Sequence, residues 1–248
     1  MQQFFVTADQ VRGDRIFVTG PDVNHIRNVL RMREGEEAAF VSGDNLRYQA
    51  VFSGIEEDAA VFEVLSSAPT ASELPVPITL FQGIPKGDKL EFITEKAVEL
   101  GAFRIVPVAM RRSVKKIESK KEEAYIRRLN AISKSAAEQS KRALVPEVTR
   151  PMRLSECLQL AKDENMQLLL PYELENGMEK TRALLTSLEK DRPLGIFIGP
   201  EGGFDPAEVE ELLESGAAPM TLGKRILRTE TAGIMLLSVL SYLLEEDA

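Results

Sequence analysis

The sequence predicts an α/β protein with two domains, a small β-barrel followed by a larger domain built on a parallel sheet. Three observations lead to this prediction. Short runs of β-branched and aromatic residues crowd positions 1–65, small polar residues fill 66–72, and strands alternate with helices from Pro75 onward. The length of 248 residues suits one or two domains, and 44% hydrophobic residues are enough for a sizeable core.

The first domain, expected at residues 1–70, contains five short strands. Turn residues such as Gly13-Asp14 and Gly20-Pro21 separate them, and one helix near 22–31 interrupts them. Closely spaced strands of this kind are typical of a small barrel. The strands are expected at 4–6, 15–18, 38–41, 48–52 and 59–64, and residues 66–72 are expected to form the linker.

The second domain, expected at residues 74–248, alternates strands with helices. Asp205 followed by Pro206 is a strong helix start, because aspartate caps the first turn and proline suits the first helical position. The alternation favours a mostly parallel sheet with helices on both faces. Strands are expected at 78–81, 104–108, 167–170, 195–198 and 219–222, and helices at 88–100, 119–142, 205–216 and 229–244.

Several classes of protein are excluded by what the sequence lacks. No apolar stretch reaches the roughly 20 residues that a membrane helix needs, and the first residues carry neither a basic lead nor a signal-length apolar block. A single cysteine, Cys157, excludes an intramolecular disulfide, and a single histidine, His25, argues against a zinc cluster. We expect a cytoplasmic protein without a metal, with Cys157 in the core and His25 partly buried in the barrel.

The net charge of −8 is unevenly distributed along the chain. Residues 104–142 contain 12 basic and 4 acidic side chains, whereas the segments on either side are acidic. Such a basic segment can bind a polyanion on one face, and the alternative is a solvated lysine-rich helix. For Arg142 the alternative is an ion pair with Glu138, one helical turn earlier. We predict that phosphates are bound by Arg111, Arg112 and Arg142, in a basic patch widened by Lys115, Lys116, Lys120, Lys121, Arg127 and Arg128.

The first candidate ligand-binding loop is rich in glycine and lies between the 195–198 strand and the helix that follows it. Open parallel sheets bind ligands beyond the carboxyl ends of their strands. Gly199, Gly202 and Gly203 would let a ligand approach the backbone closely, and the alternative is an ordinary flexible turn. The loop lacks the lysine of a Walker phosphate loop and the glycine spacing of a dinucleotide-binding fingerprint.

Two further loops follow neighbouring strands. In residues 222–232, Ile226 and Leu227 are apolar within a charged loop, and they form either a wall for a flat heterocycle or packing against the core. Thr229 or Thr231 can cap the last helix. The third loop, residues 170–173, is expected to close the pocket.

The motifs of these loops, taken together, resemble the signature of the knotted SPOUT RNA methyltransferases. From about residue 4 to 242 the chain is similar to the RsmE family of bacterial 16S ribosomal RNA (uracil-N3)-methyltransferases. The residues that carry the resemblance are Gly199-Pro200-Glu201-Gly202-Gly203, Leu222-Gly223, Ile226-Leu227-Arg228 and Glu230-Thr231-Ala232, preceded by His25-Ile26, Val29-Leu30-Arg31, Lys86-Gly87-Asp88-Lys89, Glu95-Lys96-Ala97, Glu99-Leu100-Gly101, Arg112-Ser113, Glu138-Gln139-Ser140 and Arg142.

The resemblance implies a PUA-like RNA-binding barrel and a SPOUT domain with a deep trefoil knot. It also implies S-adenosylmethionine as cofactor, 16S ribosomal RNA of the small ribosomal subunit as partner, and a homodimer whose site is built from both subunits. The residues expected to hold the cofactor are Leu170, Pro171, Gly199, Pro200, Glu201, Gly202, Gly203, Leu222, Gly223, Ile226, Leu227 and Thr231.

Methylation at N3 of uracil requires that the weakly acidic N3–H lose its proton. A carboxylate can accept this proton, and a guanidinium can stabilise negative charge on the uracil oxygens. We assign these roles to Glu230 and Arg228, with Glu201 as the rival carboxylate. The alternatives are a SPOUT enzyme for another ribosomal or transfer RNA base, or an RNA-binding module without activity.

The final helix is apolar nearly all round, more than one face of a monomer core needs. A dimer interface would cover the surplus, and full burial within the domain is the alternative.

Overall fold

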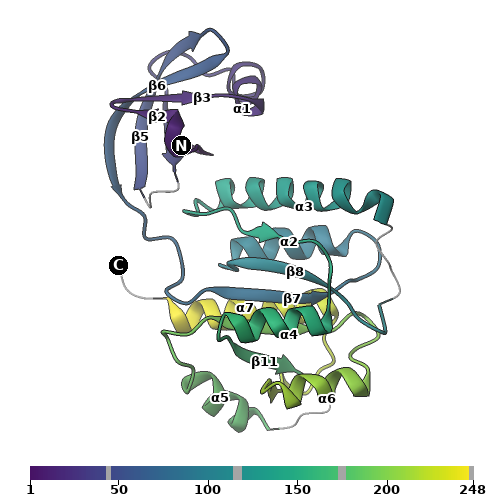
Figure 1. The fold of residues 1–248 in the computed structure, drawn as a ribbon. Helices are drawn as coiled ribbons and strands as arrows, with labels where there is room; N and C mark the ends of the chain where they lie inside the picture. The colour runs from purple at the N-terminus through teal and green to yellow at the C-terminus, as the bar shows by residue number, and fades with distance from the viewer. Residues whose placement is uncertain (43–45, 114–118, 173–176, 246–248) are drawn as a thin grey trace. The chain divides into compact units, whose positions relative to one another are not determined.

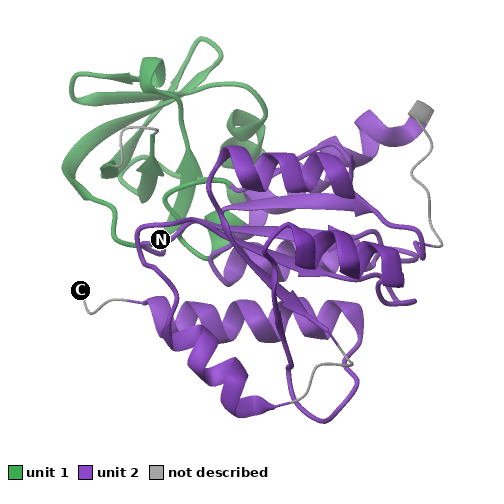
Figure 2. Ribbon diagram, turned by 60° about the horizontal axis from the view of Figure 1, so that its bottom comes forward, with its two compact units in different colours: residues 1–73, 137–145 green, residues 74–136, 146–248 purple. Residues whose placement is uncertain are grey.

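The computed structural model describes residues 1–42, 46–113, 119–172 and 177–245 (Figure 1). They form two compact units, shown in separate colours in Figure 2. The first unit comprises Met1–Glu73 and Ala137–Val145, and the second comprises Leu74–Ala136 and Pro146–Ala248. The chain therefore returns to the first unit after it has built part of the second, which the sequence did not indicate.

The first unit is built on a six-stranded sheet in the order β1-β4-β5-β6-β3-β2. Only the β1–β4 pair is parallel among the pairs in this sheet. Alternating side chains bury Phe4, Phe40 and Phe62 between the strands, with ring centroids of neighbouring pairs 5.7 and 4.6 Å apart. The strands are β1 Gln2–Phe5, β2 Val11–Arg12, β3 Arg15–Val18, β4 Glu37–Val41, β5 Leu46–Glu56 and β6 Ala59–Pro69.

One local expectation for this unit is wrong. Residues 66–69 were expected in the linker but extend β6, because β5 pairs with them as far as Leu46 opposite Pro69. The expected helix near 22–31 is confirmed as a helical stretch, formed by a short α1, Pro21–Asn24, and a π-helical segment, His25–Leu30, that ends at the left-handed Arg31. The expectation for His25 is confirmed, since its half-buried ring meets the edge of Phe4.

Arg142 belongs to the buried part of the first unit. Its side chain is 4% exposed, and its guanidinium pairs with the carboxylate of Glu73. The backbone N–H of Ala143 donates to the same carboxylate at 2.7 Å, and Gln3 Nε2 donates to the Arg142 carbonyl at 2.8 Å. The prediction that Arg142 grips RNA phosphates is therefore wrong for this structure, because a buried and paired guanidinium is not offered to a polyanion.

The second unit contains a sheet in which every pair is parallel, as predicted. Its order is β10-β8-β7-β12-β11-β13, with β9 beside β8. The two shortest strands, β9 and β10, were not predicted, because two-residue strands leave no periodic pattern. The strands are β7 Ile78–Gly83, β8 Arg104–Ala109, β9 Glu147–Val148, β10 Met152–Arg153, β11 Gln167–Pro171, β12 Leu194–Ile198 and β13 Ala218–Met220.

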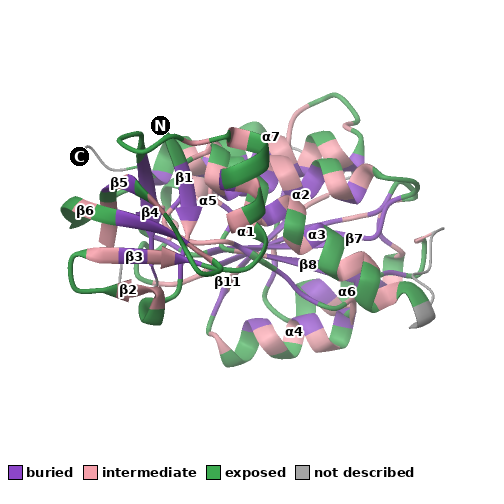
Figure 3. Ribbon diagram, turned by 90° about the horizontal axis from the view of Figure 1, so that it is seen from above, coloured by how far each residue is buried: buried purple, intermediate pink, exposed green. Residues whose placement is uncertain are grey.

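Helices cover both faces of this sheet (Figure 3). On one face Phe81 stacks on Phe197 at 4.4 Å, and both lie in the core with the buried Cys157 of α4 and Leu212 of α6. Helices α2 and α7 pack together on the other face. The helices are α2 Lys89–Glu99, α3 Ser119–Gln139, α4 Leu154–Asp163, α5 Met178–Thr186, α6 Pro206–Glu214 and α7 Thr229–Leu244.

The parallel sheet places the carboxyl ends of β8, β7, β12, β11 and β13 along one edge. All three loops singled out in the sequence start at this edge. The deep trefoil knot implied by the resemblance stays a prediction. None of the helices among the described residues has the length and hydropathy of a bilayer-spanning segment.

Candidate functional site

Three chain segments that are distant in sequence are joined at this edge by two hydrogen bonds, one buried and one partly buried. Gln82 Nε2, at the end of β7, donates to Thr229 Oγ1 at 2.8 Å. The Thr229 hydroxyl, at the start of α7, donates to the carbonyl of Gly199 at 2.6 Å, after β12. We call these three residues the clasp. The expectation that Thr229 caps α7 is wrong, because its hydroxyl is used in the clasp and Arg228 occupies the cap position without a side-chain bond.

The 199–203 loop is closely packed against the ends of neighbouring strands. A Cβ on Gly83 would lie 2.6 Å from the backbone nitrogen of Pro200, so β7 and the loop touch backbone to backbone. A Cβ on Gly202 would lie 3.1 Å from Cβ of Arg112, whose guanidinium donates to the Gly202 carbonyl at 3.2 Å. The loop is therefore seated against the ends of two neighbouring strands, and it is not an ordinary flexible turn.

Two carboxylates and one ammonium group meet beside the clasp. Lys89 Nζ, at the start of α2, lies 2.9 Å from Glu201 Oε1 and 3.4 Å from Glu230 Oε2. Burial by itself raises the pKa of Glu201, but hydrogen bonds from Lys89 and from backbone N–H groups outweigh it and leave that pKa below its usual value. The same hydrogen bond raises the pKa of Lys89, so Lys89 and Glu201 form a charged pair near neutral pH.

The other predicted cofactor residues line neighbouring strand ends. Leu170 and Pro171 pair with Pro219 and Met220 of β13, which leads directly into Leu222 and Gly223. Beyond them the side chain of Ile226 is 86% exposed, so packing of Ile226 against the core is excluded. The remaining predicted residues of this loop are the half-buried Leu227 and the exposed Arg228 and Thr231.

The predicted RNA-binding residues differ in their exposure to solvent. Arg111 and Arg112 follow β8 and remain 66% and 44% exposed, with long contacts of 3.4 and 3.8 Å to Asp205. Lys115 and Lys116 lie outside the described residues. Arg142 is buried in the first unit, as described above.

Sequence reasoning missed Gln82 and Lys89. Both flank the loop that follows β7, and the rule that ligands bind beyond the carboxyl ends of strands applies to this loop as well. The motif Lys86-Gly87-Asp88-Lys89 was noted, but no role was assigned to it.

A basic segment of the barrel unit was also missed. Residues 25–33 carry Arg27, Arg31 and Arg33 and no acidic side chain, and all three arginines are exposed. The segment before residue 104 is acidic as a whole, so its net charge concealed this short basic stretch.

Cys157 is not a nucleophile. Its side chain is fully buried under α4, as expected, and burial raises the pKa of its thiol to about 12.

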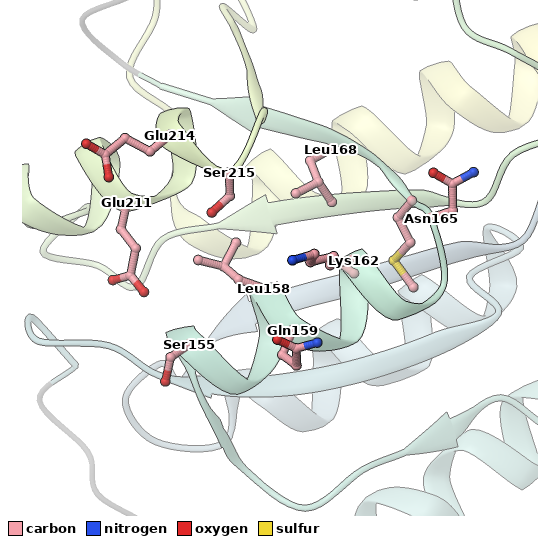
Figure 4. A pocket seen from close by; sticks show the side chains of 11 residues that line it. Ser155, Leu158, Gln159, Lys162, Asn165, Leu168, Glu211, Glu214 and Ser215 are labelled. Carbon is pink, nitrogen blue, oxygen red and sulfur yellow. The ribbon is translucent and has the colours of Figure 1, made fainter.

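A hollow between α4 and α6 lies elsewhere in the second unit (Figure 4). Met166 and Leu168 line it at the start of β11, so it opens near the amino end of that strand. The hollow is also lined by Lys162, Glu211 and Glu214, and by none of the predicted cofactor residues. The hollow is therefore separate from the strand ends where the predicted site residues lie.

The fold and the site together define the class of protein. A family model described as an RNA methyltransferase domain matches residues 72–241, and a second, described as an RNA methyltransferase PUA domain, matches residues 18–65. The chain belongs to the family of ribosomal RNA small subunit methyltransferases E.

Curated relatives resemble the chain over nearly its whole length. The ribosomal RNA small subunit methyltransferase E of Bacillus subtilis is 38% identical, with 98% of this chain and 96% of the relative covered. The protein of the same name from Synechocystis is 30% identical, with 97% and 77% covered.

Solved structures share the fold. The enzyme of the same name from Neisseria gonorrhoeae, solved bound to S-adenosyl methionine, has a TM-score of 0.84 and 31% identity over 98% of both chains. A methyltransferase from Legionella pneumophila, also solved with this cofactor, has a TM-score of 0.83 and 29% identity, with 97% of this chain and 96% of that chain covered.

The clasp makes a testable prediction about stability. Thr229→Val keeps the shape of the side chain but removes the hydroxyl, and it leaves the buried Gln82 amide and Gly199 carbonyl with fewer partners. We expect the free energy of unfolding, measured by urea denaturation, to fall by about 2 kcal/mol. Thr229→Ser keeps a hydroxyl and should retain most of the wild-type free energy of unfolding. Thr231→Val, at an exposed position, should change that free energy by less than about 0.5 kcal/mol. Equal stability of Thr229→Val and Thr231→Val would contradict the role of the clasp.

Proposed function

We propose that this protein uses S-adenosylmethionine to methylate N3 of a uridine in the 16S ribosomal RNA of the small ribosomal subunit. The observation that carries the proposal is the joint placement of the glycine loop, the clasp and two carboxylates at the carboxyl edge of a parallel sheet. Family membership supports the reaction class, and the assignment of individual residues rests on this geometry.

The residues at the edge suit the proposed cofactor. A neutral adenine ring needs an apolar slot with backbone hydrogen-bonding groups, and Leu222, Ile226 and Leu227 offer apolar surface. Loop 199–203 offers backbone unobstructed by side chains at its glycines. The residues proposed to hold the cofactor are Leu170, Pro171, Gly199, Pro200, Glu201, Gly202, Gly203, Leu222, Gly223, Ile226, Leu227 and Thr231. When bound, S-adenosylmethionine supplies an electrophilic methyl group.

The protein's own task is to make N3 nucleophilic. Glu230 accepts the N3 proton in this proposal, because Glu201 is already engaged by Lys89 and by the backbone N–H of Lys86 at 3.1 Å. Arg228 is exposed next to Glu230, and no described residue forms a hydrogen bond or ion pair with its guanidinium. Its charge is thus free to stabilise the uracil oxygens.

Glu230→Gln tests the assignment of the base. The amide cannot take a proton, so turnover should fall by about 10²- to 10⁴-fold. Binding of adenosylhomocysteine, measured by calorimetry, should stay within a few-fold of wild type. The assay is methyl transfer to small ribosomal subunits and to free 16S RNA, with mass spectrometry of the nucleosides to identify the base and atom.

The matched control is Glu245→Gln, at the other end of α7, which should retain full turnover. If Glu230→Gln kept near-full turnover while Glu201→Gln lost turnover, Glu201 would be the base and not Glu230. Methylation of transfer RNA alone, or of a different base, would replace the proposed substrate.

For RNA binding we propose Arg111 and Arg112, together with Lys115 and Lys116. Arg111 and Arg112 leave the sheet at the same edge as the glycine loop, and Arg112 bonds to that loop. Exposed arginines at this edge can neutralise backbone phosphates of the substrate near the proposed site. The PUA-like unit is proposed to dock the same RNA.

Salt dependence of RNA binding separates Arg112 from Arg142. Each lost phosphate contact should flatten the log–log slope of affinity against salt by about one unit, so we expect this change for Arg112→Ala. Arg142→Ala should leave the slope unchanged and instead lower the melting temperature, because its partner Glu73 loses its ion pair. Binding is measured well below both melting temperatures. An unchanged slope for Arg112→Ala would remove this residue from the interface.

We further propose a homodimer that uses α7. The inner side of α7 is buried, while Met235, Val239 and Tyr242 recur at helical spacing and remain partly or fully exposed. Tyr242 is 85% exposed. An apolar stripe of this kind is expected to be covered by a second copy.

Light scattering after size exclusion should give twice the chain mass of 27.5 kDa. Tyr242→Arg should shift the protein toward the monomer, because a charge would be buried in the interface. Leu213→Arg, at a 44% exposed apolar residue of α6, is the matched control and should remain dimeric. A fully active monomeric wild type would contradict the shared site.

A further inference from the structure

The ammonium group of Lys89 joins two segments that each carry a candidate base. Lys89 begins α2, Glu201 lies in the loop after β12, and Glu230 lies in the first turn of α7. The side chains are 33%, 25% and 15% exposed, respectively. Partial burial strengthens the interaction of these charges relative to pairs in open solvent.

The two carboxylates are held unequally. Glu201 accepts the Lys89 ammonium at 2.9 Å and the backbone N–H of Lys86 at 3.1 and 3.3 Å, through both of its oxygens. Glu230 makes only the longer 3.4 Å contact, and its Oε2 is buried without a hydrogen-bond partner in the described part of the chain. A buried acceptor without a donor is costly, so it is unusual in a side chain that serves only stability.

We propose that Lys89 is a positioning residue for methyl transfer: it neutralises Glu201 and holds Glu230 beside it as a carboxylate with an open acceptor. This inference rests on the proposed function. In the step it prepares, the N3 proton of uracil passes to Glu230 and the electron pair stays on N3. That pair forms the bond to the methyl carbon, while the pair of the carbon–sulfur bond leaves with the sulfur of the donor. Lys89 keeps its three protons.

The positive charge is needed because two carboxylates without a cation would compete for one proton. Like charges at short range favour protonation of one partner, and a protonated base cannot accept the N3 proton. The other charged side chains of the segments that meet here are Lys86, Asp88, Arg112 and Arg228. All four are exposed, so water and salt screen them, and Lys89 is the cation in contact with both carboxylates.

The test compares Lys89→Met with Lys89→Arg. Lys96→Met is the matched control, because Lys96 lies on the same helix and also bridges two glutamates, Glu95 and Glu99, at 2.7 and 2.8 Å. Ion pairs with this much exposure contribute little to stability, so all three variants should fold, and melting temperatures check this.

The first measurement needs no substrate. The titration of Glu201 is followed by carbon-13 NMR of carboxyl-labelled glutamate, with its signal assigned by its absence in Glu201→Gln. Loss of the Lys89 ammonium should raise the pKa of Glu201 by about one unit, and Lys89→Arg and Lys96→Met should leave it within a few tenths.

The second measurement is the pH dependence of methyl transfer. For Lys89→Met we expect the acid limb of kcat to move to higher pH by about one unit and kcat at neutral pH to fall at least about tenfold. KM for RNA and the affinity for adenosylhomocysteine should change less than about twofold, since the lysine is not proposed to contact either. Lys89→Arg should keep the acid limb at its wild-type position. The double variant Lys89→Met/Glu201→Gln removes the Glu201 carboxylate as well, so its acid limb should move back toward the wild-type position.

Each outcome decides the proposal. An unmoved Glu201 titration, or an acid limb that stays in place while activity falls equally at every pH, would overturn it and leave Lys89 a structural residue. Failure of the proposed function itself would appear differently, as a wild-type protein that transfers no methyl group to RNA. In that case the inferred role in methyl transfer falls with it, whatever the Glu201 titration shows.

Discussion

The site depends on the clasp formed by Gln82, Thr229 and Gly199. One threonine hydroxyl accepts a hydrogen bond from β7 and donates one to the chain leaving β12, and it thereby fixes where α7 begins. Gln82 and Thr229 are buried and the bond to Gly199 is partly buried, so the loss of either hydrogen bond is costly. The clasp sets the starting point of α7, and Glu230 is the next residue along that helix.

The packing beside the clasp explains the glycines at the end of β7 and in the loop after β12. Gly83 allows the backbone of β7 to approach Pro200 within a distance that a Cβ would prevent, and a Cβ on Gly202 would be tight against the stem of Arg112. The loop is thereby held rigidly while its backbone stays unobstructed by side chains. A rigid loop of this kind pre-organises a ligand site, because little conformational entropy remains to be lost on binding.

The charges are organised by the same edge. Arg112 bonds to the glycine loop, Lys89 bonds to Glu201 in that loop, and Glu230 follows the clasp threonine. The residues proposed to bind the cofactor, to contact phosphates and to act as base thus lie at adjacent strand ends, although they are far apart in sequence. The elongated basic segment of the sequence contributes to this edge only through its first residues among those described, and Arg142 at its end stabilises the other unit.

Much of the fold was readable from local patterns. Strand β3 and helix α7 were predicted with their observed limits, because periodic burial and turn residues mark both ends. The loop after β12 was found because three glycines follow a buried strand. The helix near 22–31 was also predicted, but the π-helical form of His25–Leu30 was not, because hydrophobic periodicity over six residues does not distinguish a π-helix from an α-helix.

The amino-acid sequence by itself determined the class of fold, the parallel sheet of the second unit and the loops in which a site should be sought, because these follow from hydrophobic periodicity and turn chemistry over short stretches. Only the tertiary structure decided which charged residues work together. It pairs Arg142 with Glu73 across 69 positions and Lys89 with Glu201 across 112. Such partners are set by strand order and burial, and no local pattern records them.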